Sequence, residues 1–278
     1  MAKADPDLVR DQAAGSGRRR TKSGNTWVRF MLGNLVFGRA ASSGEIGNQV
    51  PDIHERIRGE HLFGRHLLIV KTHWKYWTGL PLREDTVGVI YVLRHPVDVL
   101  ESCQNFGMLR SGRLRQTKTA EELRAISDQW VDDFIAHGGY PKFQESGIGT
   151  WEENVRSWTW SGLALPKLVL RYEDLKADPA AGLARMAKFL DLKKPEAEIE
   201  AAAARASREN MRIVEEREIA ERKEGMFYQE RNQASIEAGH RFVGRSADGT
   251  SPLTLTADQR DRARRHFASL IREFGYPE

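Results

Sequence analysis

Three runs of consecutive apolar residues mark the predicted strands of the chain. They cover residues 66–70 (HLLIV), 87–93 (VGVIYVL) and 167–170 (KLVL). Apolar residues follow one another in these runs instead of alternating with polar ones, which is typical of strands buried on both faces of a parallel sheet. The pattern therefore favours an α/β fold.

Between the runs, apolar positions recur with the period of a helix. The stretch from Asn25 predicts a helix that stops near Gly38, because glycine is common just past helix ends. Pro96 predicts the start of another helix directly after the second strand, since proline fits the first helical turn. The apolar stripe of the first helix consists of Trp27, Phe30, Met31 and Leu35.

The last third of the chain is predicted to be mostly helical. Helical patterns cover residues 178–190, 195–224 and 256–274. Polar and glycine-containing stretches at 110–122 and 244–252 predict loops instead. The sequence contains no internal repeat and no linker-like tract of proline and serine, so it predicts a single domain.

Polar residues follow each of the three predicted strands. KTH follows the first strand at residues 71–73, RHP the second at 94–96, and RYED the third at 171–174. Open parallel sheets bind their ligands beyond the carboxyl ends of the strands. We therefore expect the binding site at this edge of the sheet.

The composition is that of a globular protein without a membrane span. Of the 278 residues, 40% are hydrophobic and 29% are charged. No apolar run reaches the ~18 residues that a span needs. The first residues lack the apolar core of a signal peptide and Cys103 is the only cysteine, so we expect a cytoplasmic protein without an intrachain disulfide. The net charge of +4 suits an anionic ligand but does not argue for nucleic acid.

The stretch TKSGNTW at residues 21–27 combines groups that bind phosphate at the start of the first predicted helix. Lys22 supplies a cation and Gly24 a flexible backbone, and the N–H groups of a helix start attract anions. Further side-chain hydrogen bonds are available from Ser23, Asn25 and Thr26. The stretch lacks the Gly-x4-Gly-Lys-Ser/Thr pattern of a Walker motif, and taken alone it also fits the cap of an ordinary helix.

A second anion-binding element follows the second strand. Arg94 ends that strand, and Ser102 lies about two turns into the next predicted helix. An arginine can hold a phosphate through two parallel hydrogen bonds. A surface ion pair is the alternative role for Arg94.

Together these motifs resemble the sulfotransferases that use 3′-phosphoadenosine 5′-phosphosulfate (PAPS), in particular bacterial members with a cytosolic-type domain. TKSGNTW is similar to their 5′-phosphosulfate loop, and VIYVLRHPVDVLESCQNF at 89–106 to their 3′-phosphate element. KTHW at 71–74 resembles their Lys-Thr-His motif, and LRYEDLKADP at 170–179 their Tyr-Glu-Asp-Leu strand end. The motifs follow the family order across about residues 21–190, which is far more specific than any one motif.

The resemblance implies a single P-loop-like α/β domain of three layers, in which helices flank a central, mostly parallel sheet. Residues 21–278 would form this domain, after an irregular segment at 1–20. The resemblance also implies transfer of a sulfuryl group from PAPS, as co-substrate, to a hydroxyl or amine of a small-molecule or glycosylated acceptor. No metal ion is expected.

The resemblance further assigns roles to individual residues. His73 would be the general base, Lys22 would hold the 5′-phosphate and stabilise the leaving oxygen, and Lys71 would position the sulfuryl group. Arg94 and Ser102 would bind the 3′-phosphate. The expected donor-binding residues are Lys22, Ser23, Gly24, Asn25, Thr26, Trp27, Arg94, Ser102, Tyr172, Ser207 and Arg245.

Four departures from the family pattern bear on activity. Before the phosphate loop the chain reads AAGSGRRR where the family has an apolar strand, and arginines cannot fill a buried strand without partners. We interpret this stretch as a shifted reading frame or a wrong start rather than a lost strand. Thr21 replaces a proline, and Arg208 stands at an aromatic position. Gly244 replaces the first arginine of the C-terminal basic loop, for which Arg241 is a candidate substitute.

Other functions stay open on the sequence alone. A nucleotide or small-molecule kinase of related fold would need a Walker loop and a Mg²⁺ site. A nucleic-acid or other anion binder would use the basic residues 18–22, which lack interleaved aromatics. A catalytically impaired family member would bind nucleotide only.

The acceptor pocket is predicted at two variable segments, residues 40–63 and 105–145. The aromatic residues after His73 would line it, and the tryptophans of 150–160 would serve as core or pocket wall. These candidates are Trp74, Lys75, Tyr76, Trp77, Trp151, Trp158 and Trp160. We expect no nucleic-acid or membrane partner, and a homodimer is one option for the assembly state.

Overall fold

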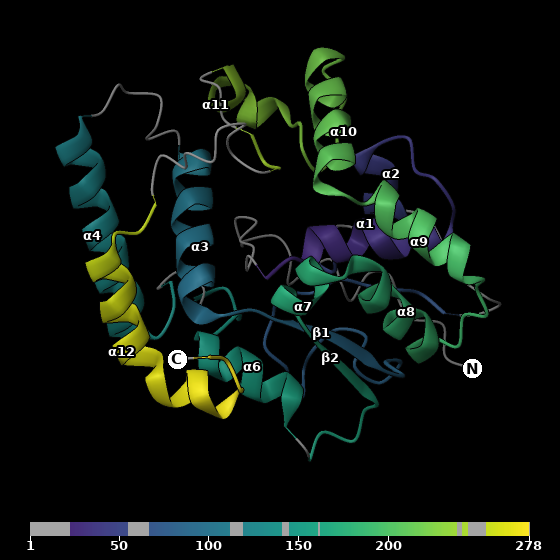
Figure 1. Cartoon of the computed structure of the whole chain (residues 1–278), viewed down its shortest axis with the longest axis horizontal. Coiled ribbons are helices and arrows are strands. Elements are labelled where there is room, and N and C mark those ends of the chain that lie inside the picture. Colours follow the sequence, from purple (N-terminus) through teal and green to yellow (C-terminus); the bar gives the residue numbers. More distant parts are fainter. Residues whose placement is uncertain are drawn as a thin grey trace.

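The structure is a computed structural model of the chain. It describes residues 23–54, 67–111, 119–140, 145–160, 162–237, 241–243 and 254–277. Within these residues, β1 (Val89–Leu93) and β2 (Lys167–Arg171) form a parallel pair near the middle of the molecule (Figure 1). Val89 pairs with Lys167 and Leu93 with Arg171. Two of the three predicted strands and their parallel orientation are therefore confirmed.

The predicted strand at 66–70 is wrong for the part that the structure describes. Residues 68–70 have no regular secondary structure, Leu67 before them is a single bridge residue, and an isolated β-bridge joins Asp52 to Lys71 just after them. A strand needs a neighbour that takes up its backbone hydrogen bonds. The described residues contain no strand beside 68–70, because the sheet found there has only β1 and β2.

The strands are also less buried than their apolar sequences predict. Val92, Leu93 and Leu170 are buried, all near the carboxyl ends, whereas the side chain of Val169 is 36% exposed. The apolar runs therefore indicated strands correctly but overstated their burial.

Helices make up most of the described chain. They are α1 (Asn25–Val36), α2 (Ser43–Gln49), α3 (Pro96–Ser111), α4 (Ala120–His137), α6 (Trp151–Thr159), α7 (Tyr172–Ala177), α8 (Pro179–Phe189), α9 (Glu196–Arg205), α10 (Arg208–Ala220), α11 (Gln233–Glu237) and α12 (Ala257–Glu273), with a 3₁₀ turn at Glu230–Asn232. The predicted helices from Asn25, from Pro96 and at 178–190 and 256–274 are confirmed to within a few residues.

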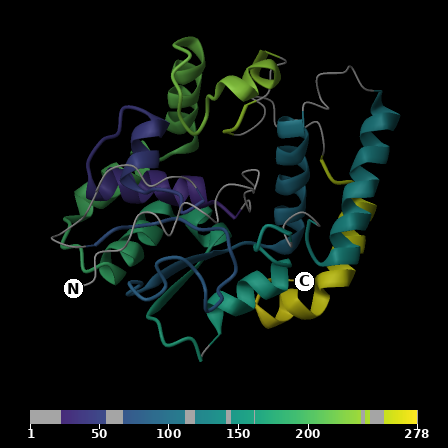
Figure 2. The same ribbon diagram turned by 180° about the vertical axis from the view of Figure 1, so that it is seen from behind.

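Two helical groups flank the strands (Figures 1 and 2). The apolar faces of α1, α8 and α9 form one core with Val92 and Leu170. The faces of α3, α4, α6 and α12 form a second core with Leu93. Because β1 contributes to both cores, its carboxyl end lies where the two groups meet. The helices and the small parallel sheet confirm the α/β class.

Helix N-caps explain why the predicted bounds of one helix and one loop are wrong. The helix predicted over 195–224 is two helices, since Ser207 caps α10 by accepting a hydrogen bond from the Asn210 backbone. The loop predicted over 110–122 is shorter in the described residues, because Thr119 and Glu122 form a capping box that starts α4 at Ala120.

No helix in the described ranges is long and apolar enough to cross a bilayer.

Candidate functional site

The N-terminus of α1 is packed closely against Tyr172. Gly24 caps the helix with φ of 98°, in the left-handed region that glycine tolerates best. A Cβ atom at this position would lie 2.6 Å from Cδ2 of Tyr172. Glycine is therefore required both by the backbone conformation and by the approach of the aromatic ring. Lys22, the expected cation of the loop, lies outside the described residues.

Three of the predicted donor-binding side chains meet at this point. Trp27 contacts Tyr172 edge to face, with ring centroids 5.8 Å apart. The guanidinium carbon of Arg94 lies 4.4 Å from the centroid of the Tyr172 ring. These residues come from α1, from the end of β1 and from the start of α7, so the structure brings together groups far apart in the sequence. A cation and two aromatic faces suit an anionic ligand with a flat ring.

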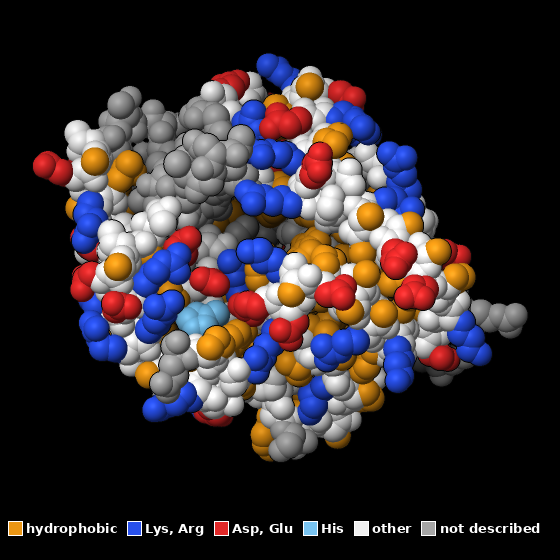
Figure 3. All heavy atoms as spheres, viewed as in Figure 1, with side chains coloured by type: hydrophobic (Ala, Val, Ile, Leu, Met, Phe, Trp, Pro, Cys, Tyr) orange, Lys and Arg blue, Asp and Glu red, His pale blue; other side chains and the backbone are white. Residues whose placement is uncertain are grey.

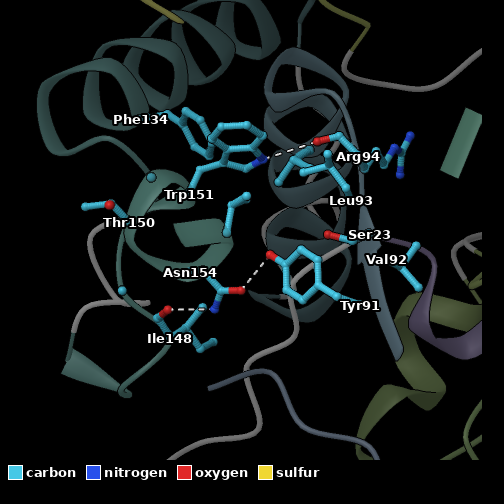
Figure 4. Close-up of a pocket in the computed structure, with 14 residues that line it drawn as sticks. Ser23, Tyr91, Val92, Leu93, Arg94, Phe134, Ile148, Thr150, Trp151 and Asn154 are labelled. Atoms are coloured by element: carbon cyan, nitrogen blue, oxygen red, sulfur yellow. Dashed lines mark hydrogen bonds between the residues drawn. The ribbon is translucent and has the colours of Figure 1, made fainter. Parts of the chain in front are cut away.

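The main chain of Arg94 is held in place from α6 and from the end of β2. The indole N–H of Trp151 donates to the backbone carbonyl of Arg94 over 3.2 Å (Figure 4). Next along the chain, the backbone N–H of His95 donates to Glu173 over 3.0 Å, and Glu173 also accepts from the hydroxyl of Tyr276. The carboxyl ends of both strands are thereby fixed relative to each other.

A small cavity marks the meeting point of β1, α6 and the phosphate loop. It has a volume of about 30 Å³. Ser23 and Arg94 line it on one side (Figure 4). Thr150, Trp151 and Asn154 of α6 and its cap line the other side. Its lining shows that the two predicted anion-binding elements, represented by Ser23 and Arg94, face the same space.

His73 is buried, with 4% of its surface exposed, and hydrogen bonds fix it on several sides. The side-chain amide of Asn25 lies 3.1 Å from Nδ1 of its ring. Its backbone N–H donates to Nε2 of His54 over 3.0 Å. Its carbonyl accepts from the side chain of Asn154 over 3.1 Å. The sequence placed His73 in the site, but it did not reveal these three partners.

Asn154 connects His73 to β1. The amide oxygen of Asn154 accepts from the hydroxyl of Tyr91 over 3.0 Å, while its NH₂ group also donates to Ile148 (Figure 4). Burial raises the pKa of Tyr91, which keeps this hydroxyl neutral and able to donate. A single asparagine on α6 therefore links the strand to the loop that carries the expected base.

Lys71 lies in a buried ion pair. Its ammonium nitrogen is 2.6 Å from a carboxylate oxygen of Asp52, and the two residues are 8% and 5% exposed. Burial acts to raise the pKa of Asp52, but the charge of Lys71, helped by His54 and Arg29, outweighs it, so the pKa lies below its ordinary value. The positive charge of Lys71 is therefore already compensated within the protein. Nothing in the sequence pattern singled out Asp52.

Among the expected donor-binding residues that the structure describes, only Ser23 and Arg94 line the cavity. Ser102 is half-buried on α3, and Ser207 is engaged as the cap of α10. Met211, on the same helix, is buried in the core that contains α1. Thr26 is half-buried in the first turn of α1, and Arg245 lies outside the described residues. Their roles in donor binding stay predictions.

The aromatic residues after His73 pack into a third apolar cluster. Trp74, Tyr76 and Trp77 surround Trp158 and two buried leucines. The indole of Trp158 donates to the backbone carbonyl of Trp74 over 2.8 Å. Trp151 and Trp158 are buried as expected, but Trp160 is 63% exposed because α6 ends just before it, so its prediction as core or pocket wall is wrong. Lys75 instead pairs with Glu153 at the surface.

The two segments predicted as acceptor loops are largely helical where the structure describes them. Residues 43–49 form α2, and 105–145 include the end of α3 and all of α4.

Figure 3 shows lysine and arginine side chains around a hollow near the middle of the molecular face seen in Figure 1. In the described residues, no group of three or more His, Cys, Asp and Glu side chains is arranged to hold a metal ion.

Glu215 on α10 holds the segment that leads toward Arg245. Its carboxylate accepts hydrogen bonds from the backbone N–H groups of Phe242 and Val243, while Arg241 pairs with Glu216. Glu215 is 1% exposed. Burial raises the pKa of Glu215 to about 7, even though these hydrogen bonds and Arg241 act to lower it.

Glu215 is expected to make the protein less stable as the pH rises from about 4.5 to about 7. In that window the folded state keeps a proton that the unfolded state has lost, so the free energy of unfolding falls by up to about 1.4 kcal/mol per pH unit. Urea unfolding of the wild type and Glu215→Gln at several pH values measures this slope. The exposed control Glu198→Gln should keep the slope, and an unchanged slope in Glu215→Gln would contradict the assignment.

Comparison with known proteins identifies the relatives of this chain. A family model described as the sulfotransferase domain matches residues 20–275. The rabbit (Oryctolagus cuniculus) amine sulfotransferase is 23% identical over 264 residues, which cover 91% of this chain and 79% of that protein. Cytosolic sulfotransferase 10 of Arabidopsis thaliana is 34% identical over 119 residues, covering 40% of this chain and 30% of that protein.

A solved structure shares the fold. The mouse sulfotransferase SULT7A1, crystallised in complex with PAP, aligns with a TM-score of 0.56 and 16% identity. The alignment covers 97% of this chain and 90% of that one. The likeness therefore extends through both helical groups and the strands between them.

Proposed function

The chain belongs to the sulfotransferase domain family, and from this premise we propose that it transfers a sulfuryl group from PAPS to a hydroxyl or amine of a small-molecule or glycosylated acceptor. The observation that carries the proposal is the contact of Gly24, Trp27 and Arg94 with the ring of Tyr172. This group lies next to the Asn25–His73 hydrogen bond, so a donor-binding region and a base are neighbours.

Donor binding would rest on groups that are suited to anions. The N-terminus of α1 offers backbone N–H groups around Gly24, where any Cβ would collide with Tyr172. Arg94 can form two parallel hydrogen bonds with a phosphate. In this proposal Lys22, Ser23, Asn25, Thr26 and the residues farther along (Ser102, Ser207 and Arg245) complete the donor site.

In this proposal His73, Lys22 and Lys71 have different chemical roles. His73 would take the proton of the acceptor, because an imidazole titrates near neutral pH and can act without a metal ion. Lys22 would supply the main positive charge at the leaving oxygen. Lys71 would contribute less, because Asp52 already compensates its charge at 2.6 Å.

The relatives support a small acceptor and a cytoplasmic location. One is named as an amine sulfotransferase and another as a cytosolic sulfotransferase. The identity of the acceptor is not part of the proposal. A homodimer stays one option for the assembly state, and we propose no nucleic-acid or membrane partner.

Titration calorimetry with 3′-phosphoadenosine 5′-phosphate (PAP), the desulfated donor, tests the proposed function. We expect micromolar binding that weakens by about 10- to 100-fold in Arg94→Ala, as a hydrogen bond to a charged group contributes about 1.5–3 kcal/mol. Lys22→Ala should weaken binding in the same direction. Arg124→Ala, which removes an exposed arginine of α4, is the control and should bind PAP normally.

Two outcomes would contradict the proposal. A folded protein that does not bind PAP would be a family member without donor chemistry. A protein that binds ATP with Mg²⁺ in preference to PAP would favour the kinase alternative.

A further inference from the structure

Asn25 lies between the predicted phosphate loop and the expected base, His73. The sequence alone does not connect these two parts of the site. Asn25 is the first residue of α1, directly after Gly24, so it belongs to the predicted phosphate loop. Its side chain points to the other motif, because Nδ2 lies 3.1 Å from Nδ1 of His73, 48 residues away. One amide group therefore borders both the expected anion and the expected base.

The hydrogen bond between Asn25 and His73 depends on where the imidazole carries its proton. A neutral imidazole has one N–H, on either Nδ1 or Nε2. When the NH₂ group of Asn25 donates to Nδ1, the proton of a neutral ring lies on Nε2. When the amide oxygen faces Nδ1 instead, it accepts from Nδ1–H, and Nε2 is then able to take a proton.

Hydrogen bonds hold the main chain of His73 in place. The backbone N–H of His73 donates to His54, and its carbonyl accepts from Asn154. The residue is buried, so neighbouring side chains rather than bulk water set its tautomer. Rotation of the Asn25 amide exchanges two groups of similar size and needs no change in the backbone.

We propose that Asn25 is a positioning residue that couples binding of the anionic donor to activation of His73 as the base. The proposal rests on the sulfotransferase function proposed above. An anion offers only hydrogen-bond acceptors, so it attracts the NH₂ group of Asn25 and leaves the amide oxygen facing Nδ1 of His73. This orientation holds the proton on Nδ1 and also stabilises the imidazolium that forms later.

The coupling fits the proton balance of sulfuryl transfer. The acceptor oxygen or nitrogen forms a bond to sulfur, and the bond between sulfur and the bridging oxygen of the donor breaks. The electron pair of that bond leaves with the 5′-phosphate of PAP. The proton of the acceptor moves to Nε2 of His73, which must therefore carry none beforehand. Before the donor binds, the same ring is held in the unreactive tautomer.

Nitrogen NMR of histidine-labelled protein reads the tautomer without any turnover. Wild-type protein is expected to show the Nε2–H form of His73 alone and the Nδ1–H form after addition of PAP. In Asn25→Asp the side chain only accepts, so the ring should carry a proton on Nδ1 with or without PAP. In Asn25→Ala the change on PAP addition should be lost.

Steady-state kinetics provide a second test. A purely structural role of Asn25 would not change the pH profile of kcat/KM. The carboxylate of Asn25→Asp should raise the pKa of His73, so the acidic limb of the kcat/KM profile should shift to higher pH by about one unit. Asn25→Ala should lower kcat by about tenfold, the worth of one hydrogen bond, and by more than it weakens PAP binding. Gln129→Glu, the same amide-to-acid change on the exposed face of α4, should alter neither signal.

The outcomes separate this coupling from the function on which it rests. PAP binding without a tautomer change at His73 would overturn the coupling and leave the donor site intact. A folded protein that does not bind PAP would overturn both. An unshifted pH profile in Asn25→Asp, alongside normal PAP binding, would remove Asn25 as the positioning residue.

Discussion

Replacing His73 with alanine is expected to lower turnover by about 10²- to 10⁴-fold, the usual contribution of a positioned general base. PAP affinity should stay close to that of the wild type, because the proposed donor-binding contacts come from Gly24, Trp27 and Arg94 around Tyr172. The imidazole instead lies beside Asn25 and faces the reacting groups in the proposed function. The loss should therefore appear in kcat rather than in the affinity for the donor.

Initial rates at saturating PAPS, together with calorimetry of PAP binding, measure the two quantities separately. His266→Ala removes an exposed histidine of α12 and serves as the matched control, with turnover expected at the wild-type level. Thermal unfolding of both variants shows whether they are folded. If His73→Ala lost PAP affinity while retaining kcat, the residue would be a donor ligand and not the base.

Replacing Asp52 with alanine is expected to lower the free energy of unfolding by about 3–5 kcal/mol, because it leaves the buried ammonium of Lys71 without its partner. The two charged groups are 2.6 Å apart and nearly inaccessible to water, so neither can be solvated when the other is removed. The β-bridge between the same two residues also joins the segment that follows α2 to the Lys-Thr-His motif. Loss of the pair should therefore loosen the base as well.

Urea unfolding at neutral pH measures this effect. The double variant Asp52→Leu with Lys71→Met should recover most of the lost stability, since apolar residues of similar volume commonly replace a buried pair well. Glu198→Ala, which breaks an exposed pair with Lys194, is the control and should have a small effect. A similarly small effect of Asp52→Ala would show that Lys71 is hydrated and available to a ligand.

The ion pair of Asp52 and Lys71 also makes the free energy of unfolding fall in acid. The pKa of Asp52 is lowered in the folded state, so the folded protein holds fewer protons than the unfolded chain near that pKa. Its stabilisation is complete above the ordinary pKa of about 4 and is lost as the pH falls through the lower folded value. Glu215 contributes in the opposite direction, because its pKa is raised in the folded state.

Local features of the sequence were enough to predict much of the fold. Continuous apolar runs identified β1 and β2, and the helical stripe from Asn25 identified α1. Proline at a first helical turn marked the start of α3. These signals lie within a few residues of the elements that they predict, and they need no knowledge of distant contacts. The four ordered motifs likewise identified the family that the domain match shows.

Predictions failed where an element depends on a distant neighbour. Residues 68–70 have the composition of a strand, but the described chain supplies no strand beside them to accept their hydrogen bonds. Trp160 has the composition of core, but it follows the end of α6 and extends into solvent. Side-chain burial is a property of the packed molecule, which composition predicts only on average.

The sequence by itself determined the family, the class of fold, the two strands and the residue types that suit an anionic donor and a base. The tertiary structure alone decided the partners of those residues. Asn25 meets His73 across 48 positions, Asp52 meets Lys71 across 19, and Asn154 meets His73 across 81. The physical reason is that a hydrogen bond or an ion pair requires specific atoms within about 3 Å, and only the folded chain brings such distant groups that close.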